Sequence, residues 1–182
     1  RPDTKLYTNM RIKISGLRGG HSGGEINSGR INAIKVAVNI MRQITNRGKI
    51  RLASLSGGRA FNVIPSEAEM VIATDIDAEL VKELCEKIER QLRCIYAATD
   101  PNIKIEAQVV KRPDKVLHAK DYDFLANLIT MIHSGVYLMN PGNPAQVLAS
   151  ANLGVVSMND ELVELKILPR ANADELVEEF ID

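Results

Sequence analysis

The sequence contains no tryptophan, only two cysteines and no apolar run long enough to cross a membrane. A membrane-spanning helix needs about 20 consecutive apolar residues, so the lack of such a run excludes a span of that kind. The first residues, Arg1-Pro2-Asp3-Thr4, do not have the charged-then-apolar order of a signal peptide. Because the chain also begins without methionine and ends inside a predicted helix, we expect a segment excised from a longer cytoplasmic protein.

The two cysteines, Cys85 and Cys94, fall in one predicted helix, too far apart along it to form a disulfide. Unpaired cysteines are typical of reducing compartments, which agrees with a cytoplasmic protein. An excess of charge is also missing, because 23 lysines and arginines balance 23 aspartates and glutamates. This balance argues against nucleic acid as a partner, since polyanions are bound through clustered positive charge.

What the sequence does contain is enough apolar material for a hydrophobic core. Hydrophobic residues make up 45% of the 182 residues, which suits one domain or two small packed units. An apolar period of two predicts strands, and a period of three to four predicts helices. These patterns follow one another as strand, helix, strand, strand, helix, strand at residues 5–14, 31–46, 49–55, 67–75, 77–95 and 102–109.

This order is that of a ferredoxin-like βαββαβ unit. We therefore predict an α+β fold over residues 5–110, with an antiparallel sheet and helices on one face. Ser28 or Asn27 is expected to cap the first helix and Asp77 the second, because such side chains accept hydrogen bonds from the free N–H groups of a helix N-terminus. The apolar stripe of the second helix is expected to comprise Leu80, Val81, Leu84, Ile88, Leu92 and Ile95.

Residues 116–182 are expected to extend this unit with a further helix and a β-hairpin. The patterns indicate a charged linker at 111–115, a helix at 121–133 and a loop at 139–144. Two paired strands at 153–158 and 162–168 follow, and then a last helix at 173–182. The hairpin is expected to turn at Asn159-Asp160. The helix is expected to bury Phe124, Leu125, Leu128, Ile129 and Ile132. These elements either continue the first sheet or form a partial pseudo-repeat, and both readings stay open.

A glycine-rich segment at residues 16–30 holds one histidine, His21, and is the first candidate for chemistry. Gly20-His21-Ser22-Gly23-Gly24 satisfies the G-x-S-x-G pattern of the nucleophile elbow in α/β-hydrolases. Too few residues precede Ser22 for the upstream strands of that fold, and the helix does not begin at the serine. A phosphate-binding P-loop is also disfavoured, because no lysine follows these glycines at the required position.

The histidines do not form a metal-binding pattern. A catalytic zinc needs about three protein ligands brought together, whereas His21, His118 and His133 are scattered and no H-x-x-x-H or C-x-x-C occurs. We therefore expect no metal ligand in this chain. Taken alone, His21 is compatible either with a turn histidine bonded to nearby backbone or with a functional group.

Several segments together resemble one family, the aminoacyl-histidine dipeptidases (Xaa-His dipeptidase, peptidase D). These are dinuclear zinc peptidases related to the carnosinases. The resemblance covers nearly the whole chain in the same order, and the string Gly16-Leu17-Arg18-Gly19-Gly20-His21-Ser22-Gly23-Gly24 is its most specific part. The other matching segments are Asn32-Ala33, Gly57-Gly58, Asn62-Val63-Ile64-Pro65, Glu67-Ala68 and Asn152-Leu153-Gly154-Val155-Val156.

The resemblance implies that residues 1–182 form a lid, or dimerisation, domain inserted between two halves of a catalytic domain. Those missing halves would be its partners in the same polypeptide and would carry the two zinc ions, so the isolated chain would be inactive. The implied substrate is a dipeptide of the Xaa-His type, and the implied assembly includes a homodimer. The alternative is a purely structural dimerisation module without a catalytic contribution.

The resemblance also assigns roles to individual residues. His21 corresponds to a histidine that stabilises the oxyanion of the tetrahedral intermediate, at the same or a partner active site. Asn62 corresponds to an asparagine that binds the substrate backbone, and Arg170 to an arginine that binds the terminal carboxylate. Pro169 departs from the family pattern beside Arg170, and Arg59 is a second candidate for the carboxylate. A solvated residue before the last helix is the structural alternative for Arg170.

Overall fold

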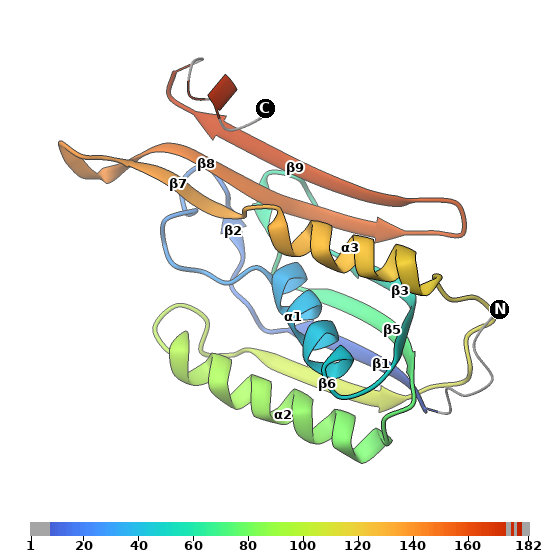
Figure 1. Cartoon of the computed structure of the whole chain (residues 1–182). Coiled ribbons are helices and arrows are strands. Elements are labelled where there is room, and N and C mark those ends of the chain that lie inside the picture. The colour runs from blue at the N-terminus through green and yellow to red at the C-terminus, as the bar shows by residue number, and fades with distance from the viewer. Residues whose placement is uncertain (1–7, 174–175, 177, 180–182) are drawn as a thin grey trace.

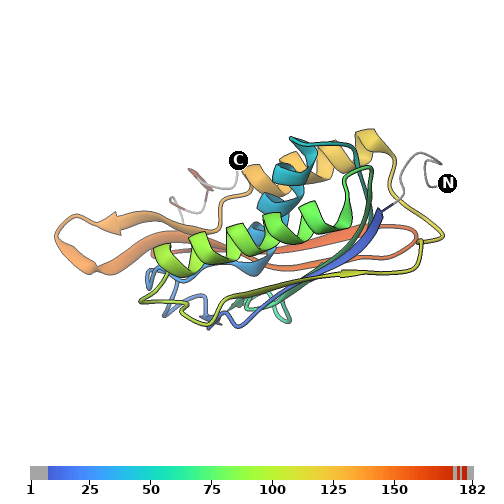
Figure 2. The same ribbon diagram turned by 90° about the horizontal axis from the view of Figure 1, so that it is seen from below.

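Three helices lie against one face of an antiparallel sheet in the computed structural model, which describes residues 8–173, 176, 178 and 179 (Figures 1 and 2). The sheet has seven strands, and every ladder in it is antiparallel. This arrangement confirms the predicted α+β class. No helix in the described part of the chain is long and apolar enough to span a membrane.

The first part of the chain forms the predicted ferredoxin-like unit. Four of its strands lie in the order β6-β1-β5-β3, so β1 stands between β6 and β5, and β5 stands between β1 and β3. The two helices connect strands that are not neighbours, as the βαββαβ order requires. The elements are β1 (Thr8–Ser15), α1 (Ala33–Thr45), β3 (Ile50–Gly57), β5 (Ala68–Thr74), α2 (Ala78–Ile95) and β6 (Lys104–Val109).

The second part of the chain continues the same sheet. Its elements are α3 (Ala119–Met131), β7 (Gly135–Asn140), β8 (Asn143–Met158) and β9 (Val163–Ala171). β8 joins β3 where Ser157 pairs with Ser56 and Val156 with Gly57. The expected bounds, a ferredoxin-like unit at 5–110 and an extension or partial pseudo-repeat at 116–182 within one domain, stay a prediction.

The two hairpins of this second part compare differently with the sequence expectations. The β8–β9 hairpin turns as predicted at Asn159, whose side-chain oxygen accepts hydrogen bonds from the N–H groups of Glu161 and Leu162 at 2.8 and 2.9 Å. The segment at 139–144, expected to be a loop, is instead the end of a β7–β8 hairpin. β7 was not predicted because its apolar residues are consecutive and show no period of two.

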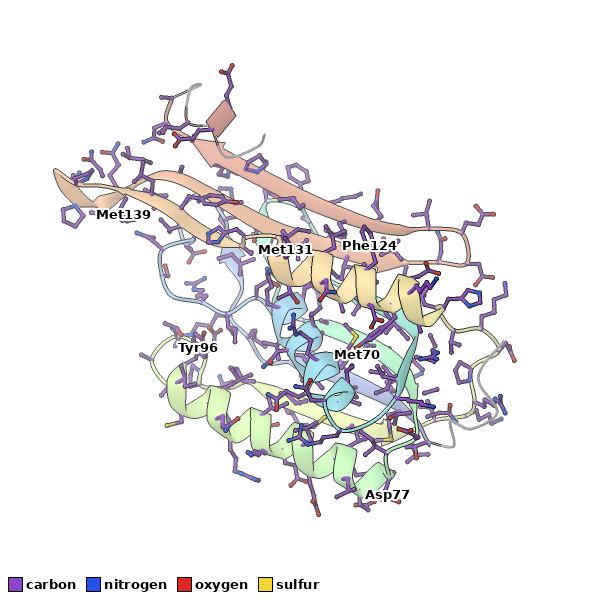
Figure 3. The ribbon with its side chains drawn as sticks, in the orientation of Figure 1. Met70, Asp77, Tyr96, Phe124, Met131 and Met139 are labelled. Carbon is purple, nitrogen blue, oxygen red and sulfur yellow. The ribbon has the colours of Figure 1, made fainter. Side chains whose placement is uncertain are left out.

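The core lies between the sheet and the helices. Met10, Ile12 and Ile14 of β1 are fully buried, as is Met70 of β5 in the middle of the sheet (Figure 3). α1 contributes the largest set of buried helix residues: Ala33, Ile34, Val36, Ala37, Val38, Ile40, Met41 and Ile44. This helix is therefore the main support of the sheet.

The caps of the two long helices show one confirmed and one wrong prediction. Asp77 caps α2, because its carboxylate accepts a hydrogen bond from the N–H of Glu79 at 2.8 Å. α1 is capped by Asn32 rather than by Ser28 or Asn27, through a bond from the N–H of Ile34 at 2.9 Å. The helix begins later than predicted because residues 22–28 form turns and bends and residues 29–31 are still irregular.

Parts of the predicted apolar stripes were wrong. Leu80 and Ile95 of α2 are 56% and 71% exposed, and Phe124 and Leu128 of α3 are 69% and 37% exposed. Each helix buries residues at i, i+3, i+4 and i+7, namely Val81, Leu84, Cys85 and Ile88 in α2, and Tyr122, Leu125, Ala126 and Ile129 in α3. Of these, the prediction missed Cys85, Tyr122 and Ala126. These narrower stripes suffice because each helix meets the body on one side only. The last predicted helix, at 173–182, lies largely outside the described residues.

One lysine ties α1 to the C-terminus of α3. The half-buried Lys35 ammonium donates to the carbonyl oxygens of Ile129 at 2.5 Å and Thr130 at 3.2 Å, and also to that of Ile132. The last carbonyls of a helix have no partner within the helix, so a cation there satisfies them and favours the helix dipole. Burial lowers the pKa of Lys35 from its ordinary value.

Replacing this lysine should therefore loosen the packing of α3. We expect Lys35→Met to reduce the free energy of unfolding by about 1–3 kcal/mol, because carbonyls that Lys35 serves lose their donor. Denaturant titration measures the change. Lys87→Met is the matched control, since Lys87 is exposed on α2. Equal stability of the two variants would contradict the capping role of Lys35.

Candidate functional site

Two segments far apart in sequence meet in a small second sheet that contains His21. β2 (Gly20–His21) pairs with β4 (Val63–Ile64) in antiparallel register, with His21 opposite Val63. The pairing continues one residue further, where the N–H of Ser22 donates to the carbonyl oxygen of Asn62 at 2.9 Å. The structure thus brings the segments that carry His21 and Asn62 side by side. We call residues 16–31 the His21 loop and residues 58–65 the Asn62 loop.

The imidazole of His21 is exposed and is oriented by its own loop. The N–H of Gly23 donates to His21 Nδ1 at 3.2 Å. A ring nitrogen that accepts a hydrogen bond carries no proton, so in the neutral ring the proton lies on Nε2. In that form the exposed His21 side chain carries its N–H donor on Nε2.

Arg170 reaches the same glycine from the other end of the chain. It lies on β9, opposite Ser150 of β8. A Cβ atom on Gly23 would stand 3.3 Å from Arg170 Cζ and 2.9 Å from His21 Cε1. The guanidinium and the imidazole therefore share the space that a side chain at Gly23 would occupy. Of the predicted site residues, His21 and Arg170 thus have side chains that lie close together, next to Gly23.

A carboxylate inside the His21 loop fixes the backbone of the histidine. Glu25 Oε2 accepts a hydrogen bond from the N–H of His21 at 2.8 Å, and its other oxygen lies 2.5 Å from Arg30. Arg30 also donates to the carbonyl oxygen of Gly19. The His21 N–H, followed by the Arg30 guanidinium, holds the pKa of Glu25 below its ordinary value of 4.5. The exposed loop is thus tied together by charge-assisted hydrogen bonds.

Only glycine fits at Gly20 within this arrangement. Its φ is +132°, in a region that L side chains rarely adopt. A Cβ there would also collide with Arg30 and Glu25. The absence of a side chain at Gly20 therefore leaves room for the Glu25–Arg30 ion pair to contact the backbone of residues 19–21.

The Asn62 loop is held by an asparagine of β8 whose role the sequence reasoning missed. Asn152 is 1% exposed, and its amide nitrogen donates to the carbonyl oxygens of Phe61 and Val63, both at 2.9 Å. Asn32 acts similarly, donating to the carbonyl of Leu153 at 2.9 Å while it caps α1. Asparagine inside an apolar strand sequence was the available signal, because a buried amide needs partners.

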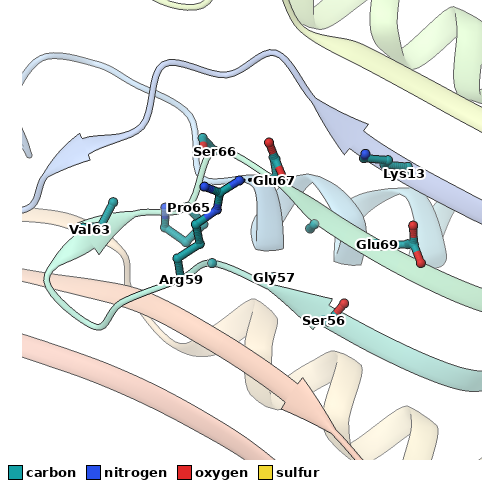
Figure 4. Close-up of a pocket in the computed structure, with 11 residues that line it drawn as sticks. Lys13, Ser56, Gly57, Arg59, Val63, Pro65, Ser66, Glu67 and Glu69 are labelled. Carbon is teal, nitrogen blue, oxygen red and sulfur yellow. Dashed lines mark hydrogen bonds and ion pairs between the residues drawn. The ribbon is translucent and has the colours of Figure 1, made fainter.

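Arg59 lies in a different environment from Arg170. Its side chain is 81% exposed, and its guanidinium is 3.4 Å from Glu67 across a pocket of about 380 Å³ (Figure 4). His21, Asn62 and Arg170 are not among the residues that line this pocket. Arg59 is therefore engaged with a carboxylate outside the His21–Arg170 cluster.

The remaining polar candidates do not assemble into a metal site. Among the described residues, no group of three or more His, Cys, Asp or Glu side chains could hold a metal ion, so these residues do not fit a zinc pair. His133 Nε2 lies 3.1 Å from the carbonyl oxygen of Val136, and its ring packs against that of Tyr137 with 4.1 Å between the centroids and a tilt of 35°. Ser22, the residue at the serine position of the hydrolase pattern, is 1% exposed.

Comparison with known proteins identifies the class to which this fold belongs. Residues 12–100 match the M20 family described as the peptidase dimerisation domain. The crystal structure of aminoacylhistidine dipeptidase from Vibrio alginolyticus has the same fold, with a TM-score of 0.92 and 23% identity over 98% of this chain. Cytosol non-specific dipeptidase from Escherichia coli (strain K12) is 31% identical over 169 residues, or 92% of this chain.

The chain therefore belongs to the M20 peptidase dimerisation domains, homologous to these two dipeptidases, and the resemblance seen in the sequence is confirmed. It covers only 35% of the Escherichia coli protein and 36% of the Vibrio protein. The chain thus spans about a third of the length of these relatives.

The shared space at Gly23 yields a direct test of the site geometry. We expect Gly23→Ala to displace the His21 ring or the Arg170 guanidinium, because the new methyl group would lie too close to both. Gly24→Ala is the matched control, since a Cβ there meets nothing within 4 Å. Crystal structures of the two variants measure the displacement. An unmoved His21 and Arg170 in Gly23→Ala would contradict the arrangement.

Proposed function

We propose that this chain is the lid and dimerisation domain of a longer zinc-dependent dipeptidase of the cytosol, and that it supplies groups to the active site. The observation that carries the proposal is the hydrogen bond from Gly23 N–H to His21 Nδ1, which leaves Nε2–H as an exposed donor. The proposed substrates are dipeptides, including those with C-terminal histidine. The zinc ions would be bound by parts of the longer protein outside this chain.

The proposed role of His21 is to stabilise negative charge on the reacting carbonyl. When water adds to a peptide carbonyl, its oxygen becomes an oxyanion, and a donor aimed at that position lowers the barrier. His21 Nε2–H suits this role because the ring is already oriented by Gly23, so little reorganisation accompanies the reaction. A single donor of this kind contributes about 3–4 kcal/mol.

Arg170 and Asn62 are proposed to bind the substrate beside this donor. A dipeptide ends in a carboxylate, and the planar guanidinium of arginine matches a carboxylate through two parallel hydrogen bonds. The contact of Arg170 with the Gly23 position supports Arg170 over Arg59 for this role. Asn62 lies directly before β4, where its backbone carbonyl oxygen accepts from the N–H of Ser22 in the His21 loop, and its side-chain amide is proposed to bind the substrate backbone.

The longer protein is proposed to be a homodimer. The family matched by residues 12–100 is a dimerisation domain, which supports association of two copies through this part of the chain. Association and the catalytic role of His21 are separate properties. A purely structural module would keep the first without the second.

The first test is His21→Ala in the full-length protein. We expect kcat for dipeptide hydrolysis to fall about 100- to 1,000-fold, because one oxyanion donor is lost, while KM and zinc content change little. His133→Ala is the control, since it removes a histidine bonded to a carbonyl of its own strand region. Near-normal turnover in His21→Ala would refute the catalytic role. A change of association state alone, measured by ultracentrifugation, would favour the structural module.

A second test separates the two arginines. We expect Arg170→Ala to raise KM for dipeptides about 10- to 100-fold, because a hydrogen-bonded partner of the substrate carboxylate is removed. Arg59→Ala should leave KM near the wild-type value, since Arg59 faces Glu67. Steady-state kinetics of the two full-length variants measure the difference. The reverse ranking would assign the carboxylate to Arg59.

A further inference from the structure

Both ends of the His21 loop are bonded to a single buried carboxylate. Asp100 Oδ1 accepts a hydrogen bond from the N–H of Arg18 at 2.8 Å, and Oδ2 accepts one from the N–H of Ile31 at 3.0 Å. Asp100 is 0% exposed. Each carboxylate oxygen thus holds one end of a loop that is remote from Asp100 in sequence.

The turn that contains Asp100 also supports the loop sterically. Gly16, at φ +77°, lies so close to the carbonyl of Asn102 that no Cβ would fit, and a Cβ on Gly29 would contact Thr99. The two ends of the loop therefore rest against residues 99–102, on either side of the carboxylate.

The turn itself is fixed to α2. The N–H of Asp100 donates to the carbonyl of Tyr96 at 2.7 Å, and Arg93 donates to the carbonyl of Pro101 at 3.2 Å. α2 packs on the sheet through its buried stripe. The position of Asp100 is consequently set by the core and not by the exposed loop.

A carboxylate is suited to this place for a chemical reason. Burial of a charge is costly unless hydrogen bonds satisfy it, and two backbone N–H donors do so here. An asparagine of the same shape has one acceptor oxygen and one NH₂ group, so it can accept from Arg18 or from Ile31 but not from both. Its NH₂ would face the other N–H.

We propose that Asp100 is a positioning residue for His21. By fixing the separation of the two loop ends, it sets the place at which the exposed imidazole of His21 stands. This inference rests on the proposed function, because it assigns to Asp100 an effect that is transmitted through His21. A displacement of about 1 Å in a catalytic group can cost about 100-fold in rate, so a clamp at the base of the loop has a large effect.

The test is a double-mutant cycle in the full-length protein with His21→Ala, Asp100→Asn and the double variant. We expect Asp100→Asn to lower kcat about 10- to 100-fold with KM within about 2-fold of wild type. In the His21→Ala background, Asp100→Asn should cause no further loss, because residues that act through one group are not additive. Hydrogen exchange at residues 16–31 should increase in Asp100→Asn, while exchange in β1 stays unchanged.

Asp75→Asn is the matched control. Asp75 also accepts a backbone hydrogen bond, from the N–H of Lys49 at 2.7 Å, but it is exposed and joins different elements. The kcat of the Asp75→Asn variant should equal that of wild type. Asp100→Ser, which keeps one acceptor without an NH₂ group, is the second variant if Asp100→Asn does not fold. If neither variant folds, Asp100 is required for the fold itself and the positioning role is refuted.

The outcomes separate this inference from the proposed function. Normal turnover in His21→Ala refutes both. A large loss in His21→Ala with normal turnover in Asp100→Asn refutes the positioning role alone. Fully additive losses in the double variant also refute it, because Asp100 would then act independently of His21.

Discussion

The constraint on which this molecule depends is that backbone N–H and C=O groups need partners even where the chain forms no regular structure. The His21 and Asn62 loops contain few residues in strands, and their own pairing satisfies only part of their backbone. Buried polar side chains provide further partners, with Asp100 at the base of one loop and Asn152 behind the other. The irregular segments are thereby held by groups that belong to the core.

The division between a regular body and irregular loops also explains what could be predicted from the sequence. The βαββαβ order followed from local periodicity, because half-buried strands and amphipathic helices reveal their buried faces in their own residues. The Asp77 cap was equally local. The Asn32 cap was missed because the start of α1 is fixed by contacts with distant residues, among them Asp100 and Leu153. β7 was missed because its apolar residues are consecutive, so no period of two marks a buried face.

The candidate site shows the same limit. Composition and spacing indicated His21 but left open the alternative of a turn histidine bonded to nearby backbone. The family resemblance indicated Asn62 and Arg170. The proximity of Arg170 to His21 could not be derived from the sequence, because it depends on β9 pairing with β8 in one register. Sequence reasoning assigned Asp100 no role and placed Asn152 only within a matching segment. Their roles depend on burial and on the two hydrogen bonds that each side chain makes to distant backbone.

The long strand β8 has a consequence for the spacing of the site. Asn152, which holds the Asn62 loop, and Ser150, which pairs with Arg170, are two residues apart on this strand and face the same side. Their separation along the strand is about 7 Å, a value set by covalent geometry and the pleat and not by side-chain rotation. β8 therefore fixes the distance between Asn152, which holds the Asn62 loop, and Ser150, which pairs with Arg170.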